Sequence, residues 1–283
     1  MPEISSYFFS APDGLKLHAL AAGPRAAPRL PVVCLPGIAR TAEDFREVIE
    51  RLAFDPECPR RVLALDSRGR GLSARDPNPA NYSVPVELGD VLALLDANGI
   101  ERAVFVGTSR GGILTMTMAA ARPRAIAGAV LNDIGPVIEM AGLLRIKSYV
   151  GRLPKPANHQ EAVEIMRKVM GGQFPGFKDA EWLLYVRRTF REVPGSSPGM
   201  GGGLELRYDP ALSQALAAID PGEPPPSLWP QFDALPPVPL MVIRGEHSDL
   251  LSGATVAEVV DVIAIGTLQR IDCLGQQLGD MDR

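Results

Sequence analysis

Short apolar runs recur along the first half of the chain, and each is followed by a stretch with helical patterning. Four of these runs have the composition of strands buried on both faces: PVVCLPG (31–37), RVLALD (61–66), AVFVG (103–107) and AGAVLND (127–133). Helical patterns at 41–54, 84–99 and 109–121 separate them. Such alternation predicts an α/β fold with a mostly parallel sheet flanked by helices and joined by right-handed crossovers.

The alternation breaks after Pro136 and resumes at VPLMVIRG (238–245). Between them, helical pieces are separated by Pro/Gly-rich links, and no strand is obvious. A helical insertion between two strands of one sheet is the simplest account. We therefore expect a core formed by 1–136 and 238–283, with a helical cap at 137–237. Six of the aromatic residues in this cap have a spacing which suggests that more than half are packing core while the rest line a substrate channel: Trp182, Tyr185, Phe190, Tyr208, Trp229 and Phe232.

Charge and composition exclude several classes of protein. The net charge of −4 and the scattered arginines give no footprint for nucleic acid. No run of 18 apolar residues predicts a spanning helix, and the first 14 residues do not have the pattern of a signal peptide. The three cysteines are far apart and odd in number, which fits neither a disulfide framework nor a zinc site. We expect a cytoplasmic protein without a membrane partner.

The segment GTSRGG (107–112) lies where a predicted strand turns into a predicted helix. A G-x-S-x-G sequence at such a corner is typical of a nucleophile elbow, which exposes the serine hydroxyl at the top of the sheet. Gly107 and Gly111 would keep side chains out of the crowded turn. The first amides of the following helix, that of Arg110 included, would favour developing negative charge. The alternative is a turn in which Ser109 only caps the helix.

Five segments together resemble the landmarks of the α/β-hydrolase family: LPGIAR (35–40), DSRGRGLS (66–73), GTSRGG (107–112), LNDIGP (131–136) and RGEHSDLLS (244–252). Among its members, the chain most resembles small bacterial hydrolases near the enol-lactonases and the carbon–carbon bond hydrolases. The likeness spans about residues 5 to 252. It implies a serine nucleophile, an acid after a later strand, a histidine after the last strand and a helical cap, with no metal or organic cofactor.

The resemblance assigns roles to particular residues. Ser109 matches the nucleophile, and the amides of Ile38 and Arg110 match the oxyanion donors. Asp249 matches the triad acid, and Asp133 is the alternative; the chain order Ser…Asp…His favours Asp249. The Arg110 side chain has two interpretations of equal weight: it could pair with a substrate carboxylate, or it could turn to Asp249 or to a carboxylate of the cap.

The segment DSRGRG (66–71) could be mistaken for a phosphate-binding loop. It lacks both the G-K-[ST] ending of a P-loop and the G-x-G-x-x-G spacing. We interpret it as a structural turn in which Arg68 bonds loop carbonyls or carboxylates.

A serine nucleophile needs a base, usually histidine. The chain has three histidines, and none follows Asp249. The resemblance places the histidine after the last strand, roughly two dozen residues or more beyond the acid. With this spacing from Asp249, the last strand falls at 267–274, and Gly275-Gln276-Gln277 stands where the family has Gly-His. An alternative alignment makes 262–272 a closing helix, and a shifted reading frame would give the same tail. His18 falls in a predicted strand and His159 in the cap; His247, two residues before Asp249, is poorly placed because base and orienting acid normally come from different loops.

We therefore predict a serine hydrolase that attacks a small ester, lactone or related carbonyl substrate by acyl transfer through Ser109. Without a histidine, its catalysis should be impaired. The alternative is a non-catalytic relative that binds a ligand under the cap or a partner protein. The expected partner is a small-molecule substrate, and the sequence leaves open whether the chain forms a homo-oligomer.

Overall fold

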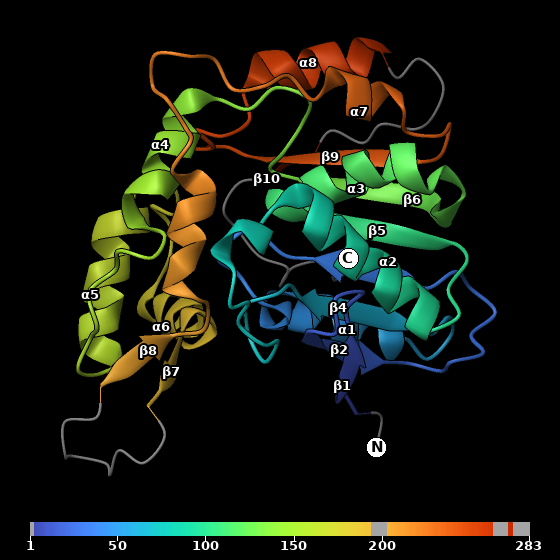
Figure 1. Cartoon of the computed structure of the whole chain (residues 1–283), viewed down its shortest axis with the longest axis horizontal. Helices are drawn as coiled ribbons and strands as arrows, with labels where there is room; N and C mark the ends of the chain where they lie inside the picture. The colour runs from blue at the N-terminus through green and yellow to red at the C-terminus, as the bar shows by residue number, and fades with distance from the viewer. Residues whose placement is uncertain (1–2, 194–202, 263–270, 274–283) are drawn as a thin grey trace.

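The computed structural model describes residues 3–193, 203–262 and 271–273, and its strands form one large sheet and one small one (Figure 1). The large sheet has the order β1-β2-β4-β3-β5-β6-β9-β10. Its first three strands pair antiparallel and every later pair is parallel, which confirms the predicted α/β architecture. The strands are β1 (Ser5–Ser10), β2 (Lys16–Ala22), β3 (Val32–Leu35), β4 (Val62–Asp66), β5 (Ala103–Thr108), β6 (Ile126–Asn132), β9 (Leu240–Gly245) and β10 (Ile271–Cys273).

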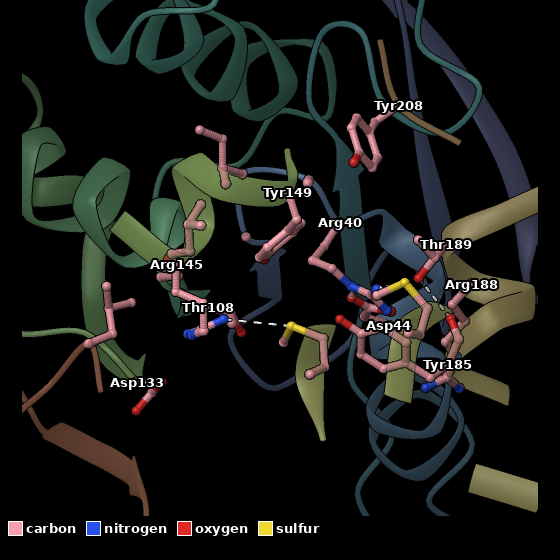
Figure 2. Close-up of a pocket in the computed structure, with 18 of the residues that line it drawn as sticks. Arg40, Asp44, Thr108, Asp133, Arg145, Tyr149, Tyr185, Arg188, Thr189 and Tyr208 are labelled. Atoms are coloured by element: carbon pink, nitrogen blue, oxygen red, sulfur yellow. Dashed lines mark hydrogen bonds and ion pairs between the residues drawn. The ribbon is translucent and has the colours of Figure 1, made fainter. Parts of the chain in front are cut away.

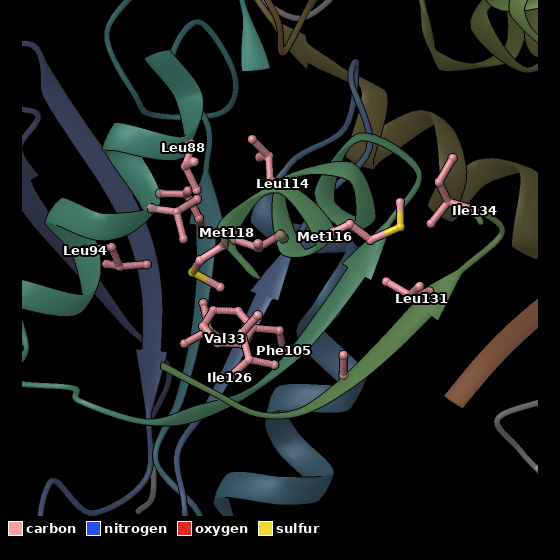
Figure 3. Packing of buried hydrophobic residues seen from close by; sticks show 14 of the residues in the cluster. Val33, Leu88, Leu94, Phe105, Leu114, Met116, Met118, Ile126, Leu131 and Ile134 are labelled. Carbon is pink, nitrogen blue, oxygen red and sulfur yellow. The ribbon is translucent and has the colours of Figure 1, made fainter. Parts of the chain in front are cut away.

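Helices cover both faces of this sheet. On β3, Val33 and Leu35 pack into the core shared with helices α2 and α3, whereas Val32 and Cys34 pack against α1. This two-residue alternation is why the strand reads as continuously apolar in the sequence. Figure 3 shows the larger core, where Phe105 of β5 lies beneath the methionines of α3. The helices are α1 (Arg46–Ala53), α2 (Val84–Ala97), α3 (Arg110–Ala121), α4 (Met140–Tyr149), α5 (His159–Met170), α6 (Asp179–Thr189), α7 (Trp229–Asp233) and α8 (Gly253–Val262). None of the described helices is long and apolar enough to cross a membrane.

The insertion between β6 and β9 contains helices α4 to α6, which lie beside one end of the large sheet (Figure 1). The insertion also contains two short strands, although none was obvious in the sequence. Strands β7 (Phe190–Glu192) and β8 (Leu204–Leu206) pair antiparallel as a separate sheet. Each has three residues, which is too short to show the alternation by which strands are recognised. Their buried residues join those of α5 and α6 in a cluster of their own.

Residues 66–71 form the expected structural turn. Arg68 is almost fully buried, and its guanidinium binds both oxygens of Asp90 at 2.6 and 2.7 Å. Its Nη1 also donates to Asp76 at 2.5 Å and to Asp13 at 2.9 Å. The prediction that Arg68 bonds carboxylates is therefore confirmed, and the turn is fixed to α2 and to the β1–β2 hairpin.

Strand β10 distinguishes between the two alignments that the sequence allowed for the C-terminal segment, where the family has its histidine. Strand β10 pairs parallel with β9, with Ile271 opposite Ile243. This agrees with the strand predicted at 267–274 and contradicts the closing-helix alternative at residues 271 and 272. Gln276, which stands where the sequence pattern places a histidine, lies outside the described residues.

Candidate active site

Ser109 stands at the junction of β5 and α3 with φ 48° and ψ −111°, one of two non-glycine residues with positive φ in the described part of the chain. Such a conformation costs about 1–3 kcal/mol and persists only where its surroundings enforce it. A Cβ on Gly111 would lie 2.0 Å from the Leu35 carbonyl oxygen, and one on Gly107 would lie 2.6 Å from the Gly111 backbone. The two glycines therefore let strand and helix approach closely enough to form this sharp corner.

Ser109 lines a cavity of about 350 Å³ (Figure 2). One wall comes from the loop after β3 and the elbow itself. The opposite wall comes from the insertion, whose contributions are mostly apolar or aromatic. The lining side chains from the insertion are Arg145, Ile146, Tyr149, Leu153, Met166, Met170, Phe174, Tyr185, Arg188, Thr189 and Tyr208. Of the six aromatic residues singled out in the sequence, only Tyr185 and Tyr208 line the cavity, and Trp182, Phe190 and Phe232 are core.

The two expected oxyanion donors belong to segments that meet at Ser109. Ile38 lines the cavity, and a Cβ on the preceding Gly37 would lie 3.8 Å from the Ser109 Cβ. The loop is fixed by Arg70, whose Nε donates to the Ile38 carbonyl at 2.8 Å. Arg110 is the first residue of α3, and the first amides of a helix have no acceptor within it. An anionic oxygen near Ser109 could therefore accept hydrogen bonds from two fixed amides.

The Arg110 side chain, by contrast, points away from the cavity and does not line it. Its Nε donates to Glu87 of α2 at 2.7 Å, and Arg70 donates to the other oxygen of Glu87 at 2.6 Å. Burial alone would raise the pKa of Glu87, but the two arginines outweigh it and the pKa lies below its usual value. The interpretation that Arg110 turns to Asp249 or to a cap carboxylate is therefore wrong, since its partner is Glu87 of the core, and this pairing speaks against contact with a substrate carboxylate. Glu87 gave no signal in the sequence, because a carboxylate in a helical pattern normally faces solvent.

We expect Arg110→Met to leave the preference between neutral and carboxylate-bearing esters unchanged. The substitution should instead destabilise the fold by about 1–3 kcal/mol, because buried Glu87 keeps only one of its two cations. Parallel turnover of a matched ester pair and denaturant unfolding of both proteins would measure these effects. A change in ester preference of tenfold or more would show that Arg110 reaches the substrate.

The two candidate acids have different surroundings. Asp133 lines the cavity with Ser109, has φ 53° and accepts a long hydrogen bond from the Gly245 amide at 3.4 Å. Burial raises the pKa of its carboxyl group above the usual value, against a hydrogen bond from Ser248. Asp249 does not line the cavity, and both its oxygens bind Arg145 of α4 at 2.6 and 2.7 Å.

None of the three histidines lines the cavity. His18 is buried in β2, with Nδ1 2.7 Å from Asp66 and Nε2 3.0 Å from Ser6, as expected for a structural strand residue. His159 begins α5, and His247 is exposed on the loop after β9. No imidazole therefore joins Ser109 to either aspartate.

Three arginines line the cavity, and none was predicted as a site residue. The Arg40 guanidinium donates to both carboxylate oxygens of Asp44 at 2.6 Å and to the Thr189 hydroxyl at 2.7 Å. Its central carbon lies 4.2 Å from the centre of the Tyr185 ring. Arg145 binds Asp249, and Arg188 binds Glu47. Arg40 closes the LPGIAR segment and could have been suspected; Arg145 and Arg188 lie in helices whose position over Ser109 no local pattern reveals.

Comparisons with known proteins agree with the architecture of the chain. A family model described as the alpha/beta hydrolase fold matches residues 31–181. A 3-hydroxybutyrate-oligomer hydrolase from Cupriavidus necator is 32% identical, over 86% of this chain and 82% of its own length. A 2-(acetamidomethylene)succinate hydrolase from Mesorhizobium japonicum is 27% identical, over 70% of this chain and 65% of its own. The crystal structure of an alpha/beta hydrolase from Novosphingobium aromaticivorans, 37% identical, superposes with a TM-score of 0.85 over 96% of this chain and 91% of that one.

Proposed function

We propose that this chain, which belongs to the α/β-hydrolase family, is a hydrolase that cleaves short esters by acyl transfer through Ser109. The observation that carries this is the strained Ser109 elbow opening into a cavity beside the Ile38 and Arg110 amides. The Ser109 Oγ would attack the ester carbonyl carbon, and the resulting oxyanion would be held by the two amides. Loss of the alcohol would leave an acyl-serine, which water then hydrolyses to the free acid.

We assign residues 137–237 as the cap that selects the substrate. Their apolar side chains in the cavity suit a short aliphatic acyl chain. Arg40, Arg145 and Arg188 also line the cavity, but each is already paired with a carboxylate, so an anionic end of the substrate would have to share or replace one of these pairs. The names of two relatives point to such an end, since oligomers of 3-hydroxybutyrate and 2-(acetamidomethylene)succinate both carry carboxylates. The proposed substrate class is therefore a short ester with a free carboxylate.

Asp249 remains our choice for the acid, with Asp133 as the alternative. Asp249 follows β9 and matches the triad acid of the family resemblance, whereas Asp133 follows β6. In this role Asp249 would have to exchange at least one of its bonds to Arg145 for a bond to a base. The Arg145–Asp249 pair supports a second candidate function, a binding protein whose acid is permanently engaged.

A fluorophosphonate probe tests the proposal independently of the base. Its fluoride leaves without needing a proton, so an exposed serine beside an oxyanion hole should still be phosphonylated slowly. We expect the intact chain to gain one phosphonyl group on Ser109, located by peptide mass spectrometry, and Ser109→Ala to gain none. Absence of labelling at Ser109 after prolonged exposure would favour the binding protein.

A further inference from the structure

A second cavity, of about 200 Å³, lies at the opposite end of the large sheet from Ser109. It is formed where β4, β3 and β5 begin, whereas Ser109 follows the carboxyl end of β5. Arg61 immediately precedes β4 and Arg102 precedes β5, on either side of Pro31 before β3. The Val32 amide donates to the Arg61 carbonyl at 2.8 Å, and the Val104 amide donates to Pro31 at 2.9 Å. These ladder bonds give the floor of the cavity a fixed backbone.

Four arginines line this basic cavity, as we call it. The loop between β2 and β3 supplies Arg25 and Arg29, which join Arg61 and Arg102. Glu101 is the one acidic residue in the lining. Among the residues that the structure describes, none of the four arginines forms an ion pair; Arg61 donates only to the Ala22 and Gly23 carbonyls, at 3.4 and 3.2 Å.

This excess of positive charge differs from the setting of the arginines at the 66–71 turn, the Ser109 elbow and helix α4. Arg68, Arg110 and Arg145 each bind a carboxylate within 2.7 Å. Arg61 is half-buried, and its pKa is lowered by burial and by the nearby Arg25. Like charges held together at a partly desolvated site repel one another, and a bound anion would relieve that repulsion.

The surrounding backbone does not supply the missing negative charge. Helix α2 ends at the rim of the basic cavity, where its carbonyl groups would attract cations. The last carbonyls are already engaged, since Asn98 donates through Nδ2 to Leu94 at 2.9 Å and Gly99 donates to Asp96 at 3.1 Å. The arginines are thus left to solvent or to a ligand.

We propose that the basic cavity binds a small multivalent phosphate anion, at a site separate from the hydrolytic one. Guanidinium groups recognise phosphate oxygens through pairs of parallel hydrogen bonds. Several guanidinium groups around one cavity favour a ligand that carries several negative charges. The volume corresponds to roughly seven water molecules, at about 30 Å³ each, which suits pyrophosphate better than a large polymer.

Titration calorimetry of the full chain with pyrophosphate at low ionic strength tests this assignment. Arg25→Gln/Arg102→Gln removes two exposed guanidinium groups and should weaken binding at least about tenfold, the equivalent of one charge-assisted bond. The matched control is Arg75→Gln/Arg152→Gln, which makes the same change in net charge at exposed positions outside both cavities. It should keep wild-type affinity, as should Ser109→Ala.

Each outcome decides the matter. Binding lost only in the Arg25/Arg102 variant supports the site, whether or not Ser109 is reactive. Absence of pyrophosphate binding overturns it, as does an equal loss in the control, which would mean general attraction by charge. Binding to vesicles containing anionic lipid, without binding to soluble pyrophosphate, would overturn it in favour of contact with a membrane surface.

Discussion

An unactivated ester such as a dimer of 3-hydroxybutyrate is expected to be hydrolysed by this chain on the order of 10⁶-fold more slowly than by serine hydrolases with a complete triad. Two steps require a base: removal of the proton from Ser109 and its delivery to the departing alkoxide. No histidine lines the cavity, and the carboxylate of Asp249 is bound by Arg145. If the Ile38 and Arg110 amides act as we propose, the oxyanion hole and substrate binding would remain, worth roughly 10³–10⁴ over water.

An activated aryl ester provides the contrast, because its phenolate leaves without a proton. We expect slow, measurable release of nitrophenolate by the wild type and a fall to background with Ser109→Ala. Turnover of the unactivated ester at ordinary enzyme rates would contradict the argument from the missing base. His247→Ala would then show whether that exposed histidine reaches Ser109, with His159→Ala as the matched control.

Replacing Arg68 by leucine should lower the free energy of unfolding by about 3–5 kcal/mol and the thermal midpoint by about 10 °C. The reason is that Asp90 and Asp76 would keep their buried charges without the guanidinium that binds them at 2.5–2.7 Å. Denaturant unfolding followed by circular dichroism measures the loss.

Two variants separate the charge effect from simple loss of packing. Arg75→Leu, at an exposed position of the same loop, should change stability by no more than about 0.5 kcal/mol. Adding Asp90→Asn to Arg68→Leu should recover part of the loss, because it removes one unpaired charge. A cost below about 1 kcal/mol for Arg68→Leu would mean that solvent reaches the carboxylates.

The sequence revealed the sheet because each buried strand carries its own local signal. Val32 to Leu35, for example, are apolar on both faces, and the Ser109 corner is marked by Gly107 and Gly111 within five residues. The same locality explains what was missed. Glu87 and Arg145 meet their partners across 23 and 104 residues of sequence, so nothing near either position announces the contact.

The hairpin of β7 and β8 was missed for a different reason. Each strand has three residues, and its buried residue packs in the cluster formed with α5 and α6, so no distinctive local composition marks it. The pairing of Asp249 with Arg145 likewise depends on the packing of α4 against the loop after β9, where the Gly142 amide donates to the Asp249 carbonyl at 2.9 Å, and motif spacing does not encode this tertiary contact.

The pairing of β6 with β9 brings Val130 opposite Met241, so the sheet continues directly across the whole inserted segment. For a flexible loop, the entropy of closure grows only with the logarithm of length, about 0.6 kcal/mol for each doubling. Insertions of very different size between these strands would therefore leave the sheet at nearly the same stability. Contacts so distant in sequence form slowly, which suggests that β9 joins after the sheet from β1 to β6 has assembled. The fold can thus exchange the segment beside Ser109 while the strands and the β5–α3 elbow beneath it stay the same.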